Sequence, residues 1–169
     1  MKVYIEYSNT SSPYGGGNQF LNRLKIFLIK KNLYAAKPEN SDVILINAFE
    51  NFRKVIRLKK IFPDKLFIHR VNGITRVYNN FFDRRDYLTQ ILNNYVSEAT
   101  IFQSNWCKFF NKKYGLKSQK YETVILNSAT KVKLKNKKKI KGKIKIVASS
   151  WSSNWNKGFG FFLWLDRNL

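Results

Sequence analysis

Residues 42–46 read Asp-Val-Ile-Leu-Ile, and this short stretch decides the fold class. A continuous aliphatic run of this kind is typical of a β-strand that is buried on both faces, as in a parallel sheet. Comparable apolar runs occur at residues 3–5, 66–68, 100–102 and 123–126. The sequence therefore predicts a series of short, buried strands.

Amphipathic segments separate these runs. The first of them places Phe20, Leu24, Phe27 and Leu28 at i, i+4, i+7 and i+8, the spacing of one helical face. Residues 52–62 form a second such stripe, which Pro63 ends. Two further stripes contain Tyr87, Leu88, Ile91, Leu92, Tyr95 and Val96, and then Trp106, Phe109, Phe110 and Tyr114 before Gly115. Alternating strands and helices predict a parallel sheet wound right-handed, so we expect a Rossmann-like α/β domain flanked by helices over residues 1–127.

The pattern changes after residue 127. Residues 128–143 look like a linker, and the stretch from Lys131 to Lys145 holds nine lysines and no acidic residue. Residues 144–148 then predict a new strand, and residues 158–169 an aromatic-rich helix. We interpret residues 144–169 as the first strand–helix unit of an incomplete second domain. Either its helix docks back on the first domain or the natural protein continues beyond Leu169, and we expect the second.

The chain is strongly basic. Its 32 Lys and Arg residues oppose 10 Asp and Glu residues, which gives a formal net charge of +22. This balance attracts phosphate groups. The lysine-rich stretch could be a solvated linker, a contact with an anionic membrane surface, or a nucleic-acid contact. Only 8 of the 32 basic residues are Arg, the side chain best suited to bidentate base recognition, so nucleic acid is the weaker partner.

Several classes are excluded by composition. Hydrophobic residues make up 44% of the chain, too many for a disordered polymer. One cysteine, Cys107, and one histidine, His69, cannot form a disulfide framework or a Cys/His zinc site, so we predict no metal. Glu6 precedes any apolar segment of a signal peptide, and no run approaches about 20 apolar residues, so we expect a cytoplasmic location.

The candidate site residues all follow predicted strands, because ligands of open α/β sheets bind outside the carboxyl ends of the strands. Gly15, Gly16 and Gly17 lie between the first strand and the first helix, where they would let a ligand approach the backbone and leave N–H groups free for an anion. The alternative is a flexible surface loop. The spacing matches neither G-x-G-x-x-G nor a P-loop.

The third strand ends in a second candidate group. Arg70 could hold a phosphate or carboxylate through two parallel hydrogen bonds, and Asn72 follows it. His69 is the only imidazole, and a lone histidine is more often structural than catalytic. No G-x-S-x-G elbow or carboxylate pair is recognisable.

Three further candidates lie later in the chain. Ser104 and Asn127 follow the fourth and fifth predicted strands, where a helix cap or turn role competes with ligand binding and is favoured for Ser104. Lys157 precedes the last helix. A lysine at a helix N-terminus is unfavourable to the dipole, which suggests that an anion offsets it, although an exposed lysine among many is the simpler interpretation.

Four groups of residues, taken in their order along the chain, resemble motifs of the glycosyltransferase family 4 group. They are the glycine-rich loop, Arg70-Val71-Asn72-Gly73, the stretch from Glu98 to Ser104, and Val124 to Asn127, followed by a loop ending in Lys157-Gly158. The resemblance implies the GT-B fold, with an acceptor-binding first domain and a second domain for a nucleotide-diphosphate sugar. It covers nearly the whole chain.

The resemblance also implies roles. Gly16 and Gly17 would line the cleft near the donor phosphates, Asn72 would lie near the reacting sugar, and Lys157 would neutralise the leaving diphosphate. Such enzymes usually transfer a sugar with retention to a glycan or glycolipid, without a metal or cofactor. Two features depart from the family pattern: residues 150–156 lack an Arg before Lys157, and the paired-glutamate segment would lie beyond Leu169. We therefore expect this chain alone to have little or no activity. The alternative is a basic, non-catalytic nucleic-acid-binding module.

Overall fold

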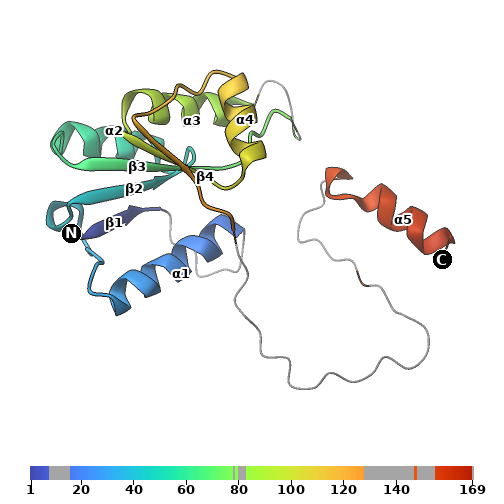
Figure 1. The fold of residues 1–169 in the computed structure, drawn as a ribbon, viewed down its shortest axis with the longest axis horizontal. Helices are drawn as coiled ribbons and strands as arrows, with labels where there is room; N and C mark the ends of the chain where they lie inside the picture. The colour runs from blue at the N-terminus through green and yellow to red at the C-terminus, as the bar shows by residue number, and fades with distance from the viewer. Residues whose placement is uncertain (8–15, 78, 80–82, 128–146, 148–154, 169) are drawn as a thin grey trace. The chain divides into compact units, whose positions relative to one another are not determined.

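A computed structural model of the chain describes residues 1–7, 16–77, 79, 83–127, 147 and 155–168. The chain divides into two compact units, residues 1–128 and 129–169, and each is described by itself. The first unit contains a sheet of five parallel strands in the order β1-β2-β3-β4-β5 (Figure 1). The strands are β1 (Val3–Glu6), β2 (Val43–Asn47), β3 (Leu66–Val71), β4 (Ala99–Phe102) and β5 (Tyr121–Val124). The predicted parallel α/β architecture is confirmed.

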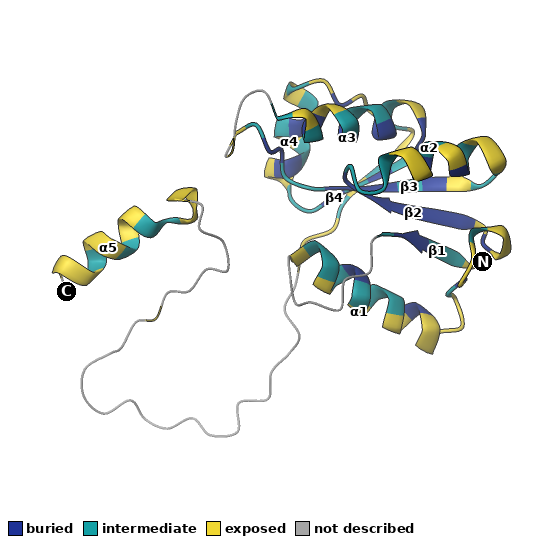
Figure 2. Cartoon of the chain, turned by 180° about the vertical axis from the view of Figure 1, so that it is seen from behind, coloured by how far each residue is buried: buried dark blue, intermediate teal, exposed yellow. Residues whose placement is uncertain are grey.

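Helices cover both faces of this sheet. Helix α1 (Gly16–Lys30) lies on one face, and α2 (Phe52–Ile61), α3 (Arg84–Tyr95) and α4 (Asn105–Lys113) lie on the other, as Figures 1 and 2 show. The short helix η1 (Pro38–Asn40) precedes β2. The second unit contains η2 (Trp155–Lys157) and α5 (Phe159–Asn168).

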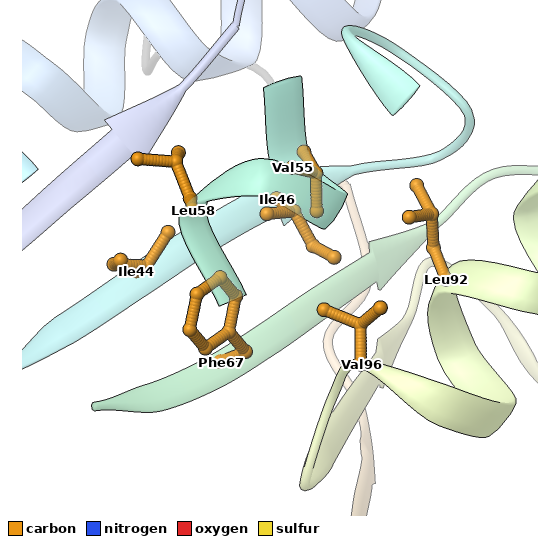
Figure 3. Close-up of a cluster of buried hydrophobic side chains, with 7 residues drawn as sticks. All are labelled: Ile44, Ile46, Val55, Leu58, Phe67, Leu92 and Val96. Carbon is orange, nitrogen blue, oxygen red and sulfur yellow. The ribbon is translucent and has the colours of Figure 1, made fainter. Parts of the chain in front are cut away.

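The core consists of two layers separated by the sheet. All five residues of β2 are buried, which confirms the strand expected from residues 42–46. Ile44 and Ile46 pack with α2 and α3, in a cluster completed by Val55, Leu58, Phe67, Leu92 and Val96 (Figure 3). Alternate strand residues point the other way, and there Leu45 packs with Ile5, Leu21 and Leu28 under α1.

A single β-bridge explains why α1 lies apart from the other helices. Tyr34, just after α1, pairs in parallel with Val3 of β1. Both backbone hydrogen bonds of Val3 on that side go to Leu33 and Ala35, so Tyr34 lies on the side of β1 that is opposite to β2. The first connection therefore runs outward from β1, whereas all later connections run from β2 toward β5. The point where the direction reverses, between β1 and β2, is where open α/β sheets place their ligands.

Several predicted helix faces are turned differently in the structure. On α4, Cys107 and Asn111 face the sheet, and Trp106 and Phe109 are 47% and 61% exposed. The Asn111 amide is buried because it donates to the carbonyls of Asn72 and Cys107. The aromatic stripe predicted to pack on the sheet is thus the outer face. The periodicity predicts the helix correctly but not the side of it that faces the sheet, because hydrogen-bonded residues such as Asn111 occupy the inner side.

On α1 and α3 the predicted stripes are only partly buried: Leu28, Leu92 and Val96 lie in the core as predicted, but other members do not. Phe27 is 54% exposed, and Leu21, absent from the predicted stripe, is fully buried. Tyr87 and Tyr95 are exposed, whereas the polar Asp86 is buried. Buried polar side chains on α3 hold neighbouring backbone segments, which the hydrophobic pattern cannot reveal.

The last predicted strand of the first unit is shifted in the structure. Strand β5 begins at Tyr121, and Ile125 and Leu126, which were predicted to end the strand, lie beyond it and are exposed. The predicted strand at residues 144–148 lies outside the described residues except for Val147, which is exposed. The whole of the predicted linker at 128–143 lies outside them too. The predicted terminal helix is present as α5.

Candidate functional site

Arg70 is the centre of the candidate site. It lies near the carboxyl end of β3 on the α1 side of the sheet, and its residue is only 3% exposed. Its guanidinium donates to Asn47 Oδ1 at 2.8 Å, to Asn72 Oδ1 at 3.0 Å and to Asn127 Oδ1 at 3.4 Å. Burial lowers the pKa of Arg70, but an arginine stays protonated in proteins. The site thus contains a buried positive charge whose hydrogen-bond acceptors are neutral amides.

No carboxylate forms an ion pair with Arg70 among the residues that the structure describes. The nearest acid in the network is Glu50, whose charge acts on Arg70 at a distance and whose hydrogen-bond link to it runs through Asn47. Asn47 donates from Nδ2 to Glu50 Oε1 at 2.9 Å and accepts from Arg70 through Oδ1. A buried cation without a paired anion is costly, and an anionic ligand would offset that cost.

An aromatic ring and a glycine bring α1 to this charge. The Arg70 Cζ atom lies 4.3 Å from the centroid of the Phe20 ring, a cation–π contact. A Cβ atom added to Gly17 would lie 3.7 Å from Asn47 Nδ2, and one added to Gly16 would meet nothing within 4 Å. The described glycines therefore lie at the N-terminus of α1, with Gly17 beside the network, and Gly15 lies outside the described residues.

Amide side chains from three strand ends complete the network. Gln103, after β4, donates through Nε2 to Asn72 Oδ1, and its Oε1 accepts from Asn127 Nδ2 at 2.7 Å. Of the predicted site residues, Arg70, Asn72 and Asn127 thus come together at one edge of the sheet. Ser104 has the cap role that was favoured for it over ligand binding: its hydroxyl accepts from the Cys107 N–H at 3.0 Å and caps α4.

Lys157 belongs to the second unit. It ends η2 and is exposed, and Gly158 follows it with a φ of +90°, a conformation that glycine adopts without strain. The N–H of Phe162 donates to the Gly158 carbonyl at 3.0 Å, so α5 begins directly after this pair. Lys157 is therefore close to the helix N-terminus at which it was predicted.

Two buried titratable groups adjoin the network. Burial raises the pKa of Glu50, although the Asn47 hydrogen bond and the charge of Arg70 oppose this effect, and Glu50 Oε2 is buried without a hydrogen bond. Burial lowers the pKa of His69 to about 4, with hydrogen bonds to Ala48 and Asn93 opposing. The His69 ring is neutral near pH 7 and lies on the α2–α4 side, where Nε2 contacts the Ala48 carbonyl at 2.9 Å. His69 therefore has a structural position, which holds Ala48 at its positive φ of 45°.

A cavity of about 180 Å³ borders Asn72 on that same side of the sheet. The turn after β2, the loop after β3, α3 and α4 contribute its walls, through Ala48, Phe49, Asn72, Gly73, Arg85 and Asn111 among others. Asp86 fixes the loop after β3, because its carboxylate accepts from the Thr75 N–H at 2.7 Å and from the Arg76 N–H at 2.8 Å. This wall of the cavity is thus held in place by a buried acid.

Scans against models of known protein families, curated proteins and solved structures found no match. Within the described ranges, no group of three or more His, Cys, Asp or Glu side chains is placed to hold a metal ion. No helix in the described part of the chain is both long and apolar enough to cross a lipid bilayer.

Four contributors to the site, Phe20, Asn47, Glu50 and Gln103, were not among the site residues selected from the sequence, although Gln103 follows a predicted strand. Asn47 and Gln103 carried a usable signal, since each is a polar residue at or after the carboxyl end of an apolar strand. Glu50 and Phe20 carried none, because their role depends on how the turn after β2 and the first turn of α1 meet.

Proposed function

We propose that this chain forms the acceptor-side domain and the beginning of the donor domain of a glycosyltransferase. The enzyme would move a sugar from a nucleotide-diphosphate sugar to a glycan or glycolipid, with retention and without a metal or cofactor. The observation that carries this proposal is the buried Arg70, which lies at the carboxyl edge of the sheet with only neutral amides as hydrogen-bond partners.

In this proposal Arg70 attracts a phosphate of the donor to the edge of the sheet. A guanidinium suits phosphate because its donors match two oxygens at once. The N-terminus of α1 adds peptide N–H groups beside the same network, and such termini favour anions. Lys157 would neutralise the departing diphosphate from the second unit.

The reaction forms a bond between an acceptor hydroxyl oxygen and the anomeric carbon of the donor sugar. The bond from that carbon to the diphosphate breaks, and the hydroxyl proton passes to the departing nucleoside diphosphate. Asn72, held by Arg70 and Gln103, would orient the reacting sugar. The 180 Å³ cavity beside Asn72 has room for about six waters, the size of one sugar ring, and would take the reacting end of the acceptor.

The proposal includes a cytoplasmic location on the inner membrane surface, where glycolipid acceptors are found. Residues 131–145, with their nine lysines, would contribute to the attraction to anionic lipids. Those residues lie outside the part of the chain that the structure describes.

The test is release of nucleoside diphosphate from a panel of nucleotide sugars, with glycolipid acceptors present, by this chain supplied with a complete donor domain. Asn72→Ala, Arg70→Lys and Lys157→Ala should each lower turnover at least about tenfold, as loss of one charge-stabilising group does. Arg53→Lys, an exposed arginine on α2, is the matched control and should change nothing. Turnover that survives all three site substitutions would remove the assigned roles.

A further inference from the structure

The outer face of α4 presents a cluster of aromatic side chains. Trp106 and Phe109 are largely exposed, and the Phe110 ring lies between them, 4.6 Å from the Trp106 ring and 5.2 Å from the Phe109 ring by centroid. Tyr114 continues the row, with 6.5 Å between its ring and that of Phe110. Exposed aromatic clusters of this kind are unusual on a surface that faces only water.

Lysines surround the aromatic cluster. Residues 105–121 contain five lysines and no acidic residue. Beside the cluster is a shallow hollow of about 440 Å³, lined by Asn105, Lys108, Phe109, Lys112 and Lys113. Lysine side chains can cover apolar surface with their hydrocarbon stems while the ammonium groups remain at the rim. Lys113 lies over the Phe110 ring at 5.9 Å.

One acid balances part of this charge. Glu122 accepts from Lys108 at 3.2 Å and from Lys112 at 2.7 Å. Helix α4 itself carries Lys108, Lys112 and Lys113, so its surface keeps a net positive charge beside the single acid Glu122. An apolar aromatic patch with a basic rim is complementary to a surface that is apolar inside and anionic outside.

Within the first unit, helix α1 offers the competing surface. Ile26, Phe27 and Ile29 are also more than half exposed there, near basic residues. This patch contains no Trp or Tyr, the side chains that favour the membrane interface, and it lies on the opposite face of the sheet (Figures 1 and 2). The two helices therefore cannot both lie flat against one planar surface.

We propose that the outer face of α4 binds a lipid bilayer that carries anionic headgroups. Trp106 and Phe109 enter the headgroup level, and Lys113, together with Lys108 and Lys112 beside Glu122, supplies the positive charge that attracts the lipid phosphates. This is a different surface from the lysine-rich residues 131–145. It depends on the packing of α4 and not on the transferase assignment.

The position of Trp106 adds a consequence for the candidate site. A Cβ atom added to Gly73 would lie 3.5 Å from Trp106 Cζ3, and Gly73 follows Asn72 directly. A bilayer on α4 would therefore border the cavity beside Asn72. Resting on the proposed function, this geometry selects an acceptor that is attached to a lipid and remains in the membrane.

The experiment measures binding of the full 169-residue chain to vesicles of phosphatidylcholine, with and without phosphatidylglycerol. Trp106→Ser combined with Phe109→Ser should weaken partitioning into the anionic vesicles at least about tenfold, since each buried aromatic ring contributes strongly to transfer from water. Ile26→Ser with Phe27→Ser, the matched pair on α1, should change partitioning less than about twofold. Circular dichroism establishes that each variant is folded, and Phe109→Ser alone serves if the double variant is not.

A second measurement separates α4 from residues 131–145. In a chain whose Trp151, Trp155 and Trp164 are replaced by Phe, Trp106 is the only fluorophore of its type. Anionic vesicles should shift its emission to the blue, and brominated lipids should quench it. Changing the lysines of residues 131–145 to Gln should reduce affinity but leave this shift at saturation.

Three results would overturn the proposal. Trp106 emission could remain unchanged at saturating lipid, or the α1 pair could reduce partitioning as much as the α4 pair. An RNA oligonucleotide could lose affinity in the α4 variants while vesicle binding stays the same, which would make this face a nucleic-acid surface. Anion binding at Arg70 is measured without vesicles, so failure here and failure of the transferase proposal are distinguishable.

Discussion

The guanidinium of Arg70 lies over the ring of Phe20 in a cation–π contact, with 4.3 Å between Cζ and the ring centroid. This contact connects the first turns of α1 to the carboxyl end of β3, two segments about 50 residues apart in the sequence. The ring limits the rotation of Arg70 and turns its donors toward the amides of Asn47 and Asn72. The buried charge is therefore fixed in position at the carboxyl edge of the sheet.

Phe20→Leu should weaken binding of inorganic pyrophosphate about fivefold. The substitution keeps an apolar side chain but removes the cation–π contact, which contributes on the order of 1 kcal/mol and orients Arg70. Titration calorimetry measures the affinity. Phe27→Leu, on the exposed side of the same helix, is the control, and equal losses in both variants would show that the contact has no special role.

The only histidine of the chain should not titrate between pH 8 and pH 5. Burial holds the pKa of His69 at about 4, and because there is one histidine, its imidazole proton signals in NMR report this residue alone. The folded state disfavours protonation, so stability from this group is lost as the pH falls from about 6.5 through 4, by about 2 kcal/mol between pH 7 and pH 5. A midpoint near 6.5 in the NMR titration would mean that the ring is solvated.

Glu50 should affect stability in the opposite direction. Burial raises its pKa above the ordinary value of 4.5, so the folded state favours the protonated carboxyl. The stability that this proton provides is present below pH 4.5 and is lost as the pH rises through the folded pKa. Glu50→Gln keeps an acceptor for Asn47 but cannot ionise. The difference in unfolding free energy between variant and wild type, from urea melts, should grow in favour of the variant with rising pH, whereas a difference independent of pH would contradict the burial of this carboxyl.

Leu21→Ala should destabilise the chain by about 2–5 kcal/mol, because it leaves a cavity in the layer under α1. Phe27→Ala should cost less than about 1 kcal/mol, since its ring is more than half exposed. Chemical denaturation of both variants tests which face of α1 is buried. A larger loss of stability in Phe27→Ala than in Leu21→Ala would mean that the buried face of α1 is the one that the spacing of residues 20–28 predicts.

Much of the fold follows from the sequence because short aliphatic runs and turn residues are local signals. The run at residues 42–46 predicts a doubly buried strand, and β2 is that strand. Gly115 lies just after the C-terminus of α4 with a φ of +106°, a conformation that favours glycine. Its place after the aromatic stripe predicted this helix end. Inner and outer helix faces were not predictable in the same way. On α4, Cys107 and Asn111 are buried by hydrogen bonds to backbone segments that are distant in the sequence.

The candidate site was predictable to a similar extent. Arg70, Asn72 and Asn127 could be selected because they follow strands, and parallel strands end at one edge. The sequence could not show that no carboxylate forms an ion pair with Arg70. Glu50 follows Asn47, the residue at the end of β2 that contacts Arg70, by only three positions, yet its link to Arg70 runs through the Asn47 amide. Ser104 lies at a strand end as well, but its hydroxyl accepts a hydrogen bond from the N–H of Cys107 and caps α4.

The most direct test of the account is the affinity of the chain for pyrophosphate, measured by calorimetry in the wild type, in Arg70→Gln and in Arg53→Gln. Both substitutions remove one positive charge, so non-specific attraction to the basic surface changes equally. If Arg70 is the buried anion site, Arg70→Gln loses at least about tenfold in affinity and Arg53→Gln less than about twofold, because a charge-assisted pair in a desolvated site is far stronger than an exposed one. Equal affinities of the two folded variants would contradict the central claim.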